Sequence, residues 1–281
     1  MMAIGIGTAV IIFTALMVVF LVAPGRLSEE AKKTARLLAG RSFAHRGLYK
    51  KDQSIAENSL EAFAAARKAG YGVELDVQLT RDGQVVVFHD GNLRRACGVD
   101  VRVDALDLQE LGKYRLFGGE AGIPLLTEAL ETLGDVPVIV ELKSMGKRNA
   151  EICRKTLDLL REKGKNWCVE SFDPRIVFWF RKNAPEVLRG QLSDHPKRFD
   201  SLPGIQRFAL GHLLSNGFTR PHFIAYGAGN KPLSVRLCHK MKPMKVVWTV
   251  REEKEHSRNA QENDAVIFEH YTPPVYVEKK E

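Results

Sequence analysis

The chain has 281 residues, of which 44% are hydrophobic and 27% are charged, a composition that excludes an intrinsically disordered or collagen-like protein. Its 42 Lys and Arg residues outweigh its 34 Asp and Glu residues and give a formal net charge of +8, so its surface should attract anions. The basic residues do not gather with aromatic residues in a nucleic-acid-binding motif, and we expect no nucleic-acid partner.

An apolar segment opens the chain. Residues 3–23 contain no charged side chain, and 21 helical residues match the hydrocarbon core of a bilayer, about 30 Å thick. The alternative is a cleaved signal peptide, but the start lacks basic residues, and Leu21 and Pro24 do not suit a cleavage site. The sequence therefore predicts a transmembrane anchor over residues 1–24.

Basic residues flank this segment on one side only. Residues 25–41 have a helical composition that ends at Gly40, which favours a juxtamembrane linker or helix. Five basic residues lie within it or at its end: Arg26, Lys32, Lys33, Arg36 and Arg41. By the positive-inside rule, we expect a single-pass protein of the cell membrane whose C-terminal bulk lies in the cytoplasm.

Short apolar runs alternate with helical stretches over residues 42–281. The expected strands cover residues 42–47, 73–79, 138–143, 167–172, 187–192, 222–226, 245–250 and 265–269. Eight strands separated by helices predict an α/β fold, the (β/α)8 TIM barrel. A further run, residues 85–90, follows an Asp-Gly step at Asp82 and Gly83, which indicates a hairpin.

Ionisable residues end several of these strands, at the edge of the barrel where active sites lie. Glu74, Asp76 and Glu141 are candidate metal ligands, because residues two apart on a strand point to the same side and these carboxylates should converge inside the barrel. Converging carboxylates repel one another unless a cation lies among them, and an oxygen-only ligand set suits Ca²⁺ or Mg²⁺ better than zinc. Solvated strand ends or a salt bridge between Glu141 and Lys143 are the alternative.

Two histidines and two cations accompany the carboxylates. His45 and His89 each follow an apolar run, and two histidines offer a base and an acid near neutral pH. Arg46 and Lys143 add positive charge that suits a phosphate oxyanion. Trp248, near the end of a strand, is a candidate pocket wall or a core residue.

The motifs occur in an ordered series: H-R-G at 45–47, E-N-S at 57–59, E-L-D-V-Q at 74–78, T-R-D-G at 80–83, H-D at 89–90 and E-L-K at 141–143. This series resembles the glycerophosphodiester phosphodiesterase family, whose members are (β/α)8 barrels. The resemblance implies metal-dependent hydrolysis of a phosphodiester to a phosphomonoester and an alcohol. In this reaction a glycerol hydroxyl of the substrate attacks first and forms a cyclic phosphate, which water then opens.

The resemblance also implies residue roles. Glu74, Asp76 and Glu141 would hold Ca²⁺ or Mg²⁺. His45 and His89 would act as base and acid. Arg46 and Lys143 would bind the phosphate, and Trp248 would wall the substrate pocket.

The chain departs from the family pattern in one place. After the last strand the family often has Thr-Asp, whereas this chain has Phe268-Glu269-His270, so we expect altered geometry at the mouth. Asn58 looks like a helix N-cap with Glu61 at the third helical position, which gives it no catalytic role.

Three functions remain open from the sequence. The first is a membrane-anchored, bacterial-type glycerophosphodiester phosphodiesterase working at the cytoplasmic face of the membrane. The second is a lysophospholipase D-like hydrolase that acts on lysophospholipids. The third is a catalytically silent barrel that binds lipid head groups, but such a protein would need the cations and not the whole set of histidines and carboxylates. The sequence does not decide the oligomeric state.

Overall fold

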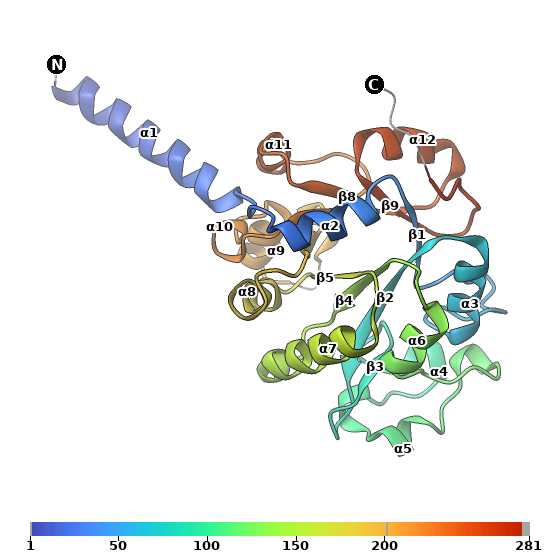
Figure 1. The fold of residues 1–281 in the computed structure, drawn as a ribbon. Coiled ribbons are helices and arrows are strands. Elements are labelled where there is room, and N and C mark those ends of the chain that lie inside the picture. Colours follow the sequence, from blue (N-terminus) through green and yellow to red (C-terminus); the bar gives the residue numbers. More distant parts are fainter. Residues whose placement is uncertain (1, 201, 277–281) are drawn as a thin grey trace.

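The computed structural model describes residues 2–200 and 202–276, with side chains described from Val10 onward. In this part of the chain, eight parallel strands close into a barrel surrounded by helices (Figure 1), which confirms the predicted TIM barrel. The barrel strands are β1 (Ser42–His45), β2 (Gly72–Leu79), β4 (Val138–Leu142), β5 (Trp167–Ser171), β6 (Arg189–Ser193), β7 (Phe223–Gly227), β8 (Met244–Val250) and β9 (Ala265–Phe268). Pairing of β1 with both β2 and β9 closes the ring.

Strand β3 (Val85–Val87) pairs antiparallel with the end of β2, as the Asp-Gly step predicted. Gly83 takes a φ of 80° in the connecting turn, a backbone conformation that glycine adopts without strain. The hairpin leads directly to His89 at the mouth of the barrel.

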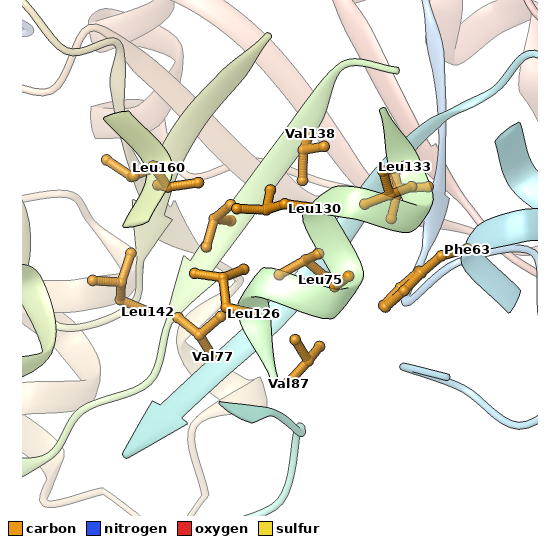
Figure 2. Close-up of a cluster of buried hydrophobic side chains, with 14 of the residues drawn as sticks. Phe63, Leu75, Val77, Val87, Leu126, Leu130, Leu133, Val138, Leu142 and Leu160 are labelled. Atoms are coloured by element: carbon orange, nitrogen blue, oxygen red, sulfur yellow. The ribbon is translucent and has the colours of Figure 1, made fainter. Parts of the chain in front are cut away.

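Helices pack on the outside of the barrel. They are α3 (Leu60–Ala69), α6 (Leu126–Leu133), α7 (Asn149–Lys163), α8 (Pro174–Asn183), α9 (Gly204–Gly211), α10 (Asn216–Thr219), α11 (Leu233–Lys240) and α12 (Glu253–Glu262). Two short helices, α4 (Arg94–Cys97) and α5 (Leu108–Leu111), instead pack in a separate apolar cluster with Val86 and Phe88. Leu75 and Val77 of β2 pack against the apolar face of α6, which includes Leu126 and Leu130 (Figure 2). Because side chains alternate along a strand, Glu74 and Asp76, which alternate with Leu75 and Val77 in β2, point into the barrel.

Helix α2 (Glu29–Leu38) closes the amino-terminal end of the barrel. Ser28 caps it by accepting a hydrogen bond from the Ala31 backbone N–H at 3.1 Å. Ala31 and Leu38 are buried against apolar residues at the starts of the strands, such as Phe43 and Phe223. The segment that the sequence predicted as a juxtamembrane linker or helix thus also forms the floor of the barrel core.

Helix α1 (Met2–Val22) projects away from the barrel (Figure 1). The C-terminal end of α1 joins the barrel domain. There Phe20 packs edge-on against Phe218 with ring centroids 5.6 Å apart, and Val22 is buried beside Leu213. Among the described residues, no helix is both long enough and apolar enough to cross a bilayer. The predicted transmembrane span is therefore not confirmed.

The buried side of α2 should contribute much of the stability of the barrel floor. Leu38 is 0% exposed and the adjacent Leu37 is 46% exposed. We expect Leu38→Ala to lower the free energy of unfolding by about 2–5 kcal/mol, since it leaves a cavity in the core. Leu37→Ala is the matched control and should change it by less than about 1 kcal/mol. Urea unfolding followed by tryptophan fluorescence measures both, and equal effects would show that α2 does not close the core.

Candidate active site

The predicted site residues converge at the carboxyl end of the barrel. His45 is the last residue of β1, Glu74 and Asp76 lie in β2, and Glu141 lies in β4. A pocket at this end is lined by His45, Arg46, Glu74, His89, Glu141, Glu170, Phe172, Leu192, Trp248 and Ile267. Parallel strands bring together residues that lie nearly a hundred positions apart in the sequence.

Three buried carboxylates form the centre of the site. Oxygen atoms of Glu74, Asp76 and Glu141 all lie within 4.8 Å of one another. The register pairs Asp76 with Glu141, so the two side chains stand at one level of the barrel. Burial, followed by the charges of Asp76 and Glu141, raises the pKa of Glu74 well above its ordinary value.

Lys143 lies between two of these carboxylates. Its Nζ is 2.7 Å from both Asp76 Oδ1 and Glu141 Oε1. Burial would lower the pKa of Lys143, but the charges of the two carboxylates outweigh it and raise that pKa above its ordinary value. Lys143 is therefore a buried cation held by the same oxygens that could hold a metal ion.

Arg46 contributes a second cation. Its backbone N–H donates to Glu74 Oε2 at 3.2 Å, and its guanidinium lies 3.4 Å from Asp76 and 2.7 Å from Glu57. Both cations that the sequence assigned to phosphate binding therefore also neutralise carboxylates.

Glu170 is a site residue that the sequence analysis missed. It is buried in β5, in register with Glu141, and lines the pocket. Its Oε2 has no hydrogen-bond partner in the described part of the chain. The sequence offered one signal for Glu170, its place near the end of the predicted strand 167–172. With it, four carboxylates face two cations, so this donor set lacks positive charge and fits a divalent cation that prefers oxygen ligands.

His45 is oriented by Glu269. The His45 Nδ1 lies 2.6 Å from Glu269 Oε2, and Glu269 also accepts hydrogen bonds from the Tyr49 hydroxyl at 2.8 Å and from Arg251 Nε at 2.5 Å. Burial would raise the pKa of Glu269, but the bond to His45 and its neighbours outweigh burial and hold that pKa well below its ordinary value. The departure from the family pattern after β9 thus places the Glu269 carboxylate against His45.

The pKa of His45 is lowered. Burial is the largest cause and disfavours the imidazolium, whereas the hydrogen bond to Glu269 opposes the shift. With Nδ1 bound to a carboxylate, the His45 proton is fixed on Nδ1 and Nε2 faces the carboxylate cluster, 3.8 Å from Glu74 Oε2.

His89 is bound in the same manner. Its Nδ1 lies 2.6 Å from Asp90 Oδ1, and Arg95 Nε donates to the other oxygen of Asp90 at 2.7 Å. Arg95 also pairs with Glu57, which connects His89 to Arg46 through a chain of charges. The two histidines thus share one geometry, although His45 ends β1 and His89 lies in the loop after β3.

Asn58 is not the helix N-cap that the sequence predicted. Ser59 caps α3 instead, accepting a hydrogen bond from the Ala62 backbone N–H at 3.1 Å. Asn58 has a φ of 55°, and its Nδ2 donates to Asp76 Oδ2 at 2.8 Å. The structure therefore places Asn58 behind the carboxylate cluster, where it orients Asp76.

Trp248 lines the apolar half of the pocket. Its Nε1 donates to the Ser193 carbonyl at 3.1 Å, and its ring packs edge-on against Phe172 with centroids 5.4 Å apart. Phe172 in turn contacts Phe199, with centroids 5.9 Å apart. The pocket is thus polar around Glu74, Glu141 and Glu170 and apolar around Phe172, Leu192 and Trp248.

A TIM barrel with a carboxylate cluster, two carboxylate-bound histidines and two buried cations has the residues of a metal-dependent acid–base enzyme. The sequence matches the Glycerophosphoryl diester phosphodiesterase family over residues 45–272, and the chain belongs to that family.

Curated relatives align with about half of the chain. It is 37% identical over 161 residues to the Glycerophosphodiester phosphodiesterase of Caldanaerobacter subterraneus, an alignment covering 53% of this chain and 65% of that protein. It is 33% identical over 144 residues to Lysophospholipase D GDPD1 of Mus musculus, covering 47% of this chain and 44% of that protein. The chain therefore matches less than two thirds of the length of either relative.

Two solved structures share the fold. A glycerophosphodiester phosphodiesterase of Thermotoga maritima is 28% identical with a TM-score of 0.61, covering 81% of this chain and 93% of that chain. An Oleispira antarctica phosphodiesterase in complex with sn-glycerol-3-phosphate is 22% identical with a TM-score of 0.67, covering 83% of this chain and 94% of that chain.

The carboxylate cluster should bind a divalent cation. We expect Asp76→Asn to weaken the binding of Ca²⁺ or Mg²⁺ by more than about tenfold, because it removes one charged ligand from the set. Asp135→Asn, an exposed aspartate outside the site, is the matched control and should bind as the wild type does. Isothermal titration calorimetry with each ion measures the effect. Equal affinities for the two variants would show that the cluster is not the binding site.

Proposed function

We propose that this chain is a metal-dependent phosphodiester hydrolase that cleaves glycerophosphodiesters to glycerol phosphate and an alcohol. The observation that carries the proposal is the pair of histidines, each held through Nδ1 by a carboxylate at 2.6 Å, in the same pocket as the buried carboxylate cluster. Family membership and the relative named Glycerophosphodiester phosphodiesterase support the same activity.

The histidines exchange protons with the substrate. His45, with its lowered pKa, is the neutral base that takes the proton of the attacking hydroxyl, and His89 is the acid that donates a proton to the leaving alkoxide. Glu269 stabilises the imidazolium that forms when His45 accepts its proton. Asp90 holds His89 in the orientation that leaves its Nε2 for the leaving group.

Glu74, Asp76 and Glu141 hold the cofactor in this proposal, a Ca²⁺ or Mg²⁺ ion. When bound, such an ion stabilises negative charge on the phosphoryl oxygens. Arg46 lines the same pocket, Lys143 is held by Asp76 and Glu141 of the carboxylate cluster, and both supply positive charge to the phosphate. Asn58 keeps Asp76 oriented, and Trp248 covers the side of the substrate away from the carboxylates.

A lysophospholipid is the second candidate substrate. The apolar half of the pocket, with Phe172, Leu192 and Trp248, offers surface to an acyl chain. The relative named Lysophospholipase D GDPD1 supports this reading.

Membrane attachment through α1 completes the proposal. The segment is free of charge, and its side chains from Val10 to Phe20 are exposed, with Ile11 and Phe13 among them. The basic residues that follow it favour a catalytic domain on the cytoplasmic side of the cell membrane, next to anionic lipid.

The activity is tested with full-length protein in detergent. We expect release of glycerol phosphate from glycerophosphocholine or glycerophosphoglycerol, identified by mass spectrometry, to stop with EDTA and return with Ca²⁺ or Mg²⁺. His45→Ala should lower the rate by about 10²–10⁴-fold. Release of lysophosphatidic acid from a lysophospholipid alone would favour the second substrate. Equal rates for His45→Ala and wild type would leave a binding barrel as the function.

Glu269 should control the pH dependence of this reaction. Neutral His45 is the base, so the rate falls as pH falls through the pKa of His45, which lies below its ordinary value. Glu269→Gln removes a charge that raises this pKa, so the acidic limb of the kcat profile should move to lower pH. We also expect kcat to fall by about 10²-fold or more.

Glu252→Gln is the control for Glu269→Gln, since Glu252 is exposed and pairs with Lys254 away from the pocket. It should leave the pH profile and kcat unchanged. An acidic limb that stays in place or moves to higher pH in Glu269→Gln would contradict the assignment of Glu269 as the partner of His45.

A further inference from the structure

Three apolar side chains are exposed on helices α9 and α11. Ile205 is 86% exposed, Phe208 is 54% exposed and Leu233 is 79% exposed. Ile205 and Phe208 are three positions apart on α9 and therefore lie on one face of that helix. We call the surface formed by these three residues the α9/α11 surface.

Contacts between the two helices join these residues into one patch. The ring of Phe208 stacks on His212 with centroids 4.2 Å apart. His212 Nδ1 lies 2.9 Å from the hydroxyl of Ser234, the residue next to Leu233. The contact between His212 and Ser234 thus brings the exposed apolar residues of α9 and α11 onto neighbouring parts of the surface.

The α9/α11 surface lies between α1 and the mouth of the barrel. Leu237, one turn after Leu233, lines an apolar groove together with α1 side chains from Val10 to Val19. At the other end, α9 and α11 begin where β6 and β7 have ended, at the carboxyl end of the barrel. The loop that precedes α9 carries Phe199, which contacts the pocket residue Phe172. Apolar residues thus lie at both ends of the α9/α11 surface, Leu237 beside α1 and Phe199 beside the pocket.

Helices α9 and α11 and the segment between them carry basic residues and no acidic residue. Between Asp200 and Arg251 the sequence contains no Asp or Glu. Arg207 lies between Ile205 and Phe208, and Arg198 and Arg236 lie near the patch in sequence; within the described part of the chain these arginines form no salt bridge, and Arg236 Nε donates to the Lys231 carbonyl at 3.1 Å. Exposed apolar side chains bordered by unpaired cations are typical of a surface that lies in the interface of an anionic membrane.

We propose that the α9/α11 surface docks onto an anionic lipid bilayer, with Ile205, Phe208 and Leu233 in the apolar boundary and the arginines at the head groups. Continuity with α1 and charge complementarity favour a bilayer over a protein partner. This contact orients the mouth of the barrel toward the lipid, so that a substrate leaves the membrane beside apolar residues. The docking rests on the membrane attachment proposed for α1, and it is independent of whether the chain hydrolyses phosphodiesters.

Tryptophan quenching tests the contact in the full-length chain. Phe208→Trp, Leu233→Trp and the control Leu37→Trp are each mixed with phosphatidylglycerol vesicles that carry brominated acyl chains. Leu37 is an exposed leucine on the floor of the barrel. We expect bromine to quench the introduced tryptophan at 208 and 233 roughly twofold or more above that at 37, because only the first two positions reach the acyl region.

A charge reversal tests the role of the arginines. In the Leu233→Trp background, Arg198→Glu with Arg236→Glu should lower the affinity of the surface for anionic vesicles by roughly fivefold per cation and reduce the quenching. Lys113→Glu with Arg154→Glu makes the same change of charge at exposed positions elsewhere and should leave quenching unchanged.

Several results would overturn the proposal. Equal quenching at positions 37, 208 and 233, or no binding of the chain to anionic vesicles, would do so. So would a dimer in sedimentation velocity that Phe208→Asp dissociates, since a second copy of the chain would then cover the surface. Hydrolysis of soluble glycerophosphocholine by the same variants is measured separately, so failure of the proposed activity cannot be mistaken for failure of docking.

Discussion

The site depends on one electrostatic constraint: four carboxylates are buried together at the mouth of a barrel. Glu74, Asp76, Glu141 and Glu170 are removed from water, where each negative charge is costly unless a cation or a donor balances it. Arg46 and Lys143 supply only part of that balance. The residues around them, including Asn58, are accordingly arranged as donors to carboxylate oxygens. A cluster still short of positive charge is suited to a divalent cation.

The contact between His45 and Glu269 depends on closure of the barrel. His45 and Glu269 are separated by more than two hundred residues, yet they meet because β1 pairs with β9. His89 needs no such closure, since Asp90 is its neighbour in sequence. The two histidines thus reach the same geometry by different routes, and the orientation of His45 depends on the complete ring of strands.

The barrel has two chemically different halves. Strands β2, β4 and β5 carry the four carboxylates, and the cations directly follow β1 and β4, whereas Phe172, Leu192 and Trp248 form an apolar wall of the pocket. The same asymmetry continues on the outside, where the acid-free segment between Asp200 and Arg251 forms α9 and α11. A pocket with one polar and one apolar wall suits a molecule that joins a phosphate to an apolar group, and the α9/α11 surface faces the direction from which such a molecule would come.

Local patterns in the sequence determined the fold class and the centre of the site. Strand alternation places Glu74 and Asp76 on the same side of β2 regardless of the rest of the chain, and the Asp-Gly turn determines the hairpin before His89. Three other contacts depend on the register between strands and on the paths of loops, which no local pattern encodes. They are the hydrogen bond between Glu269 and His45, the position of Glu170 beside Glu141 and the hydrogen bond from Asn58 to Asp76. The same holds for α2, whose charged sequence suggested a juxtamembrane linker or helix. Only the packing of Ala31 and Leu38 against the starts of the strands made it the floor of the barrel, because burial is a property of what surrounds a helix and not of the helix alone.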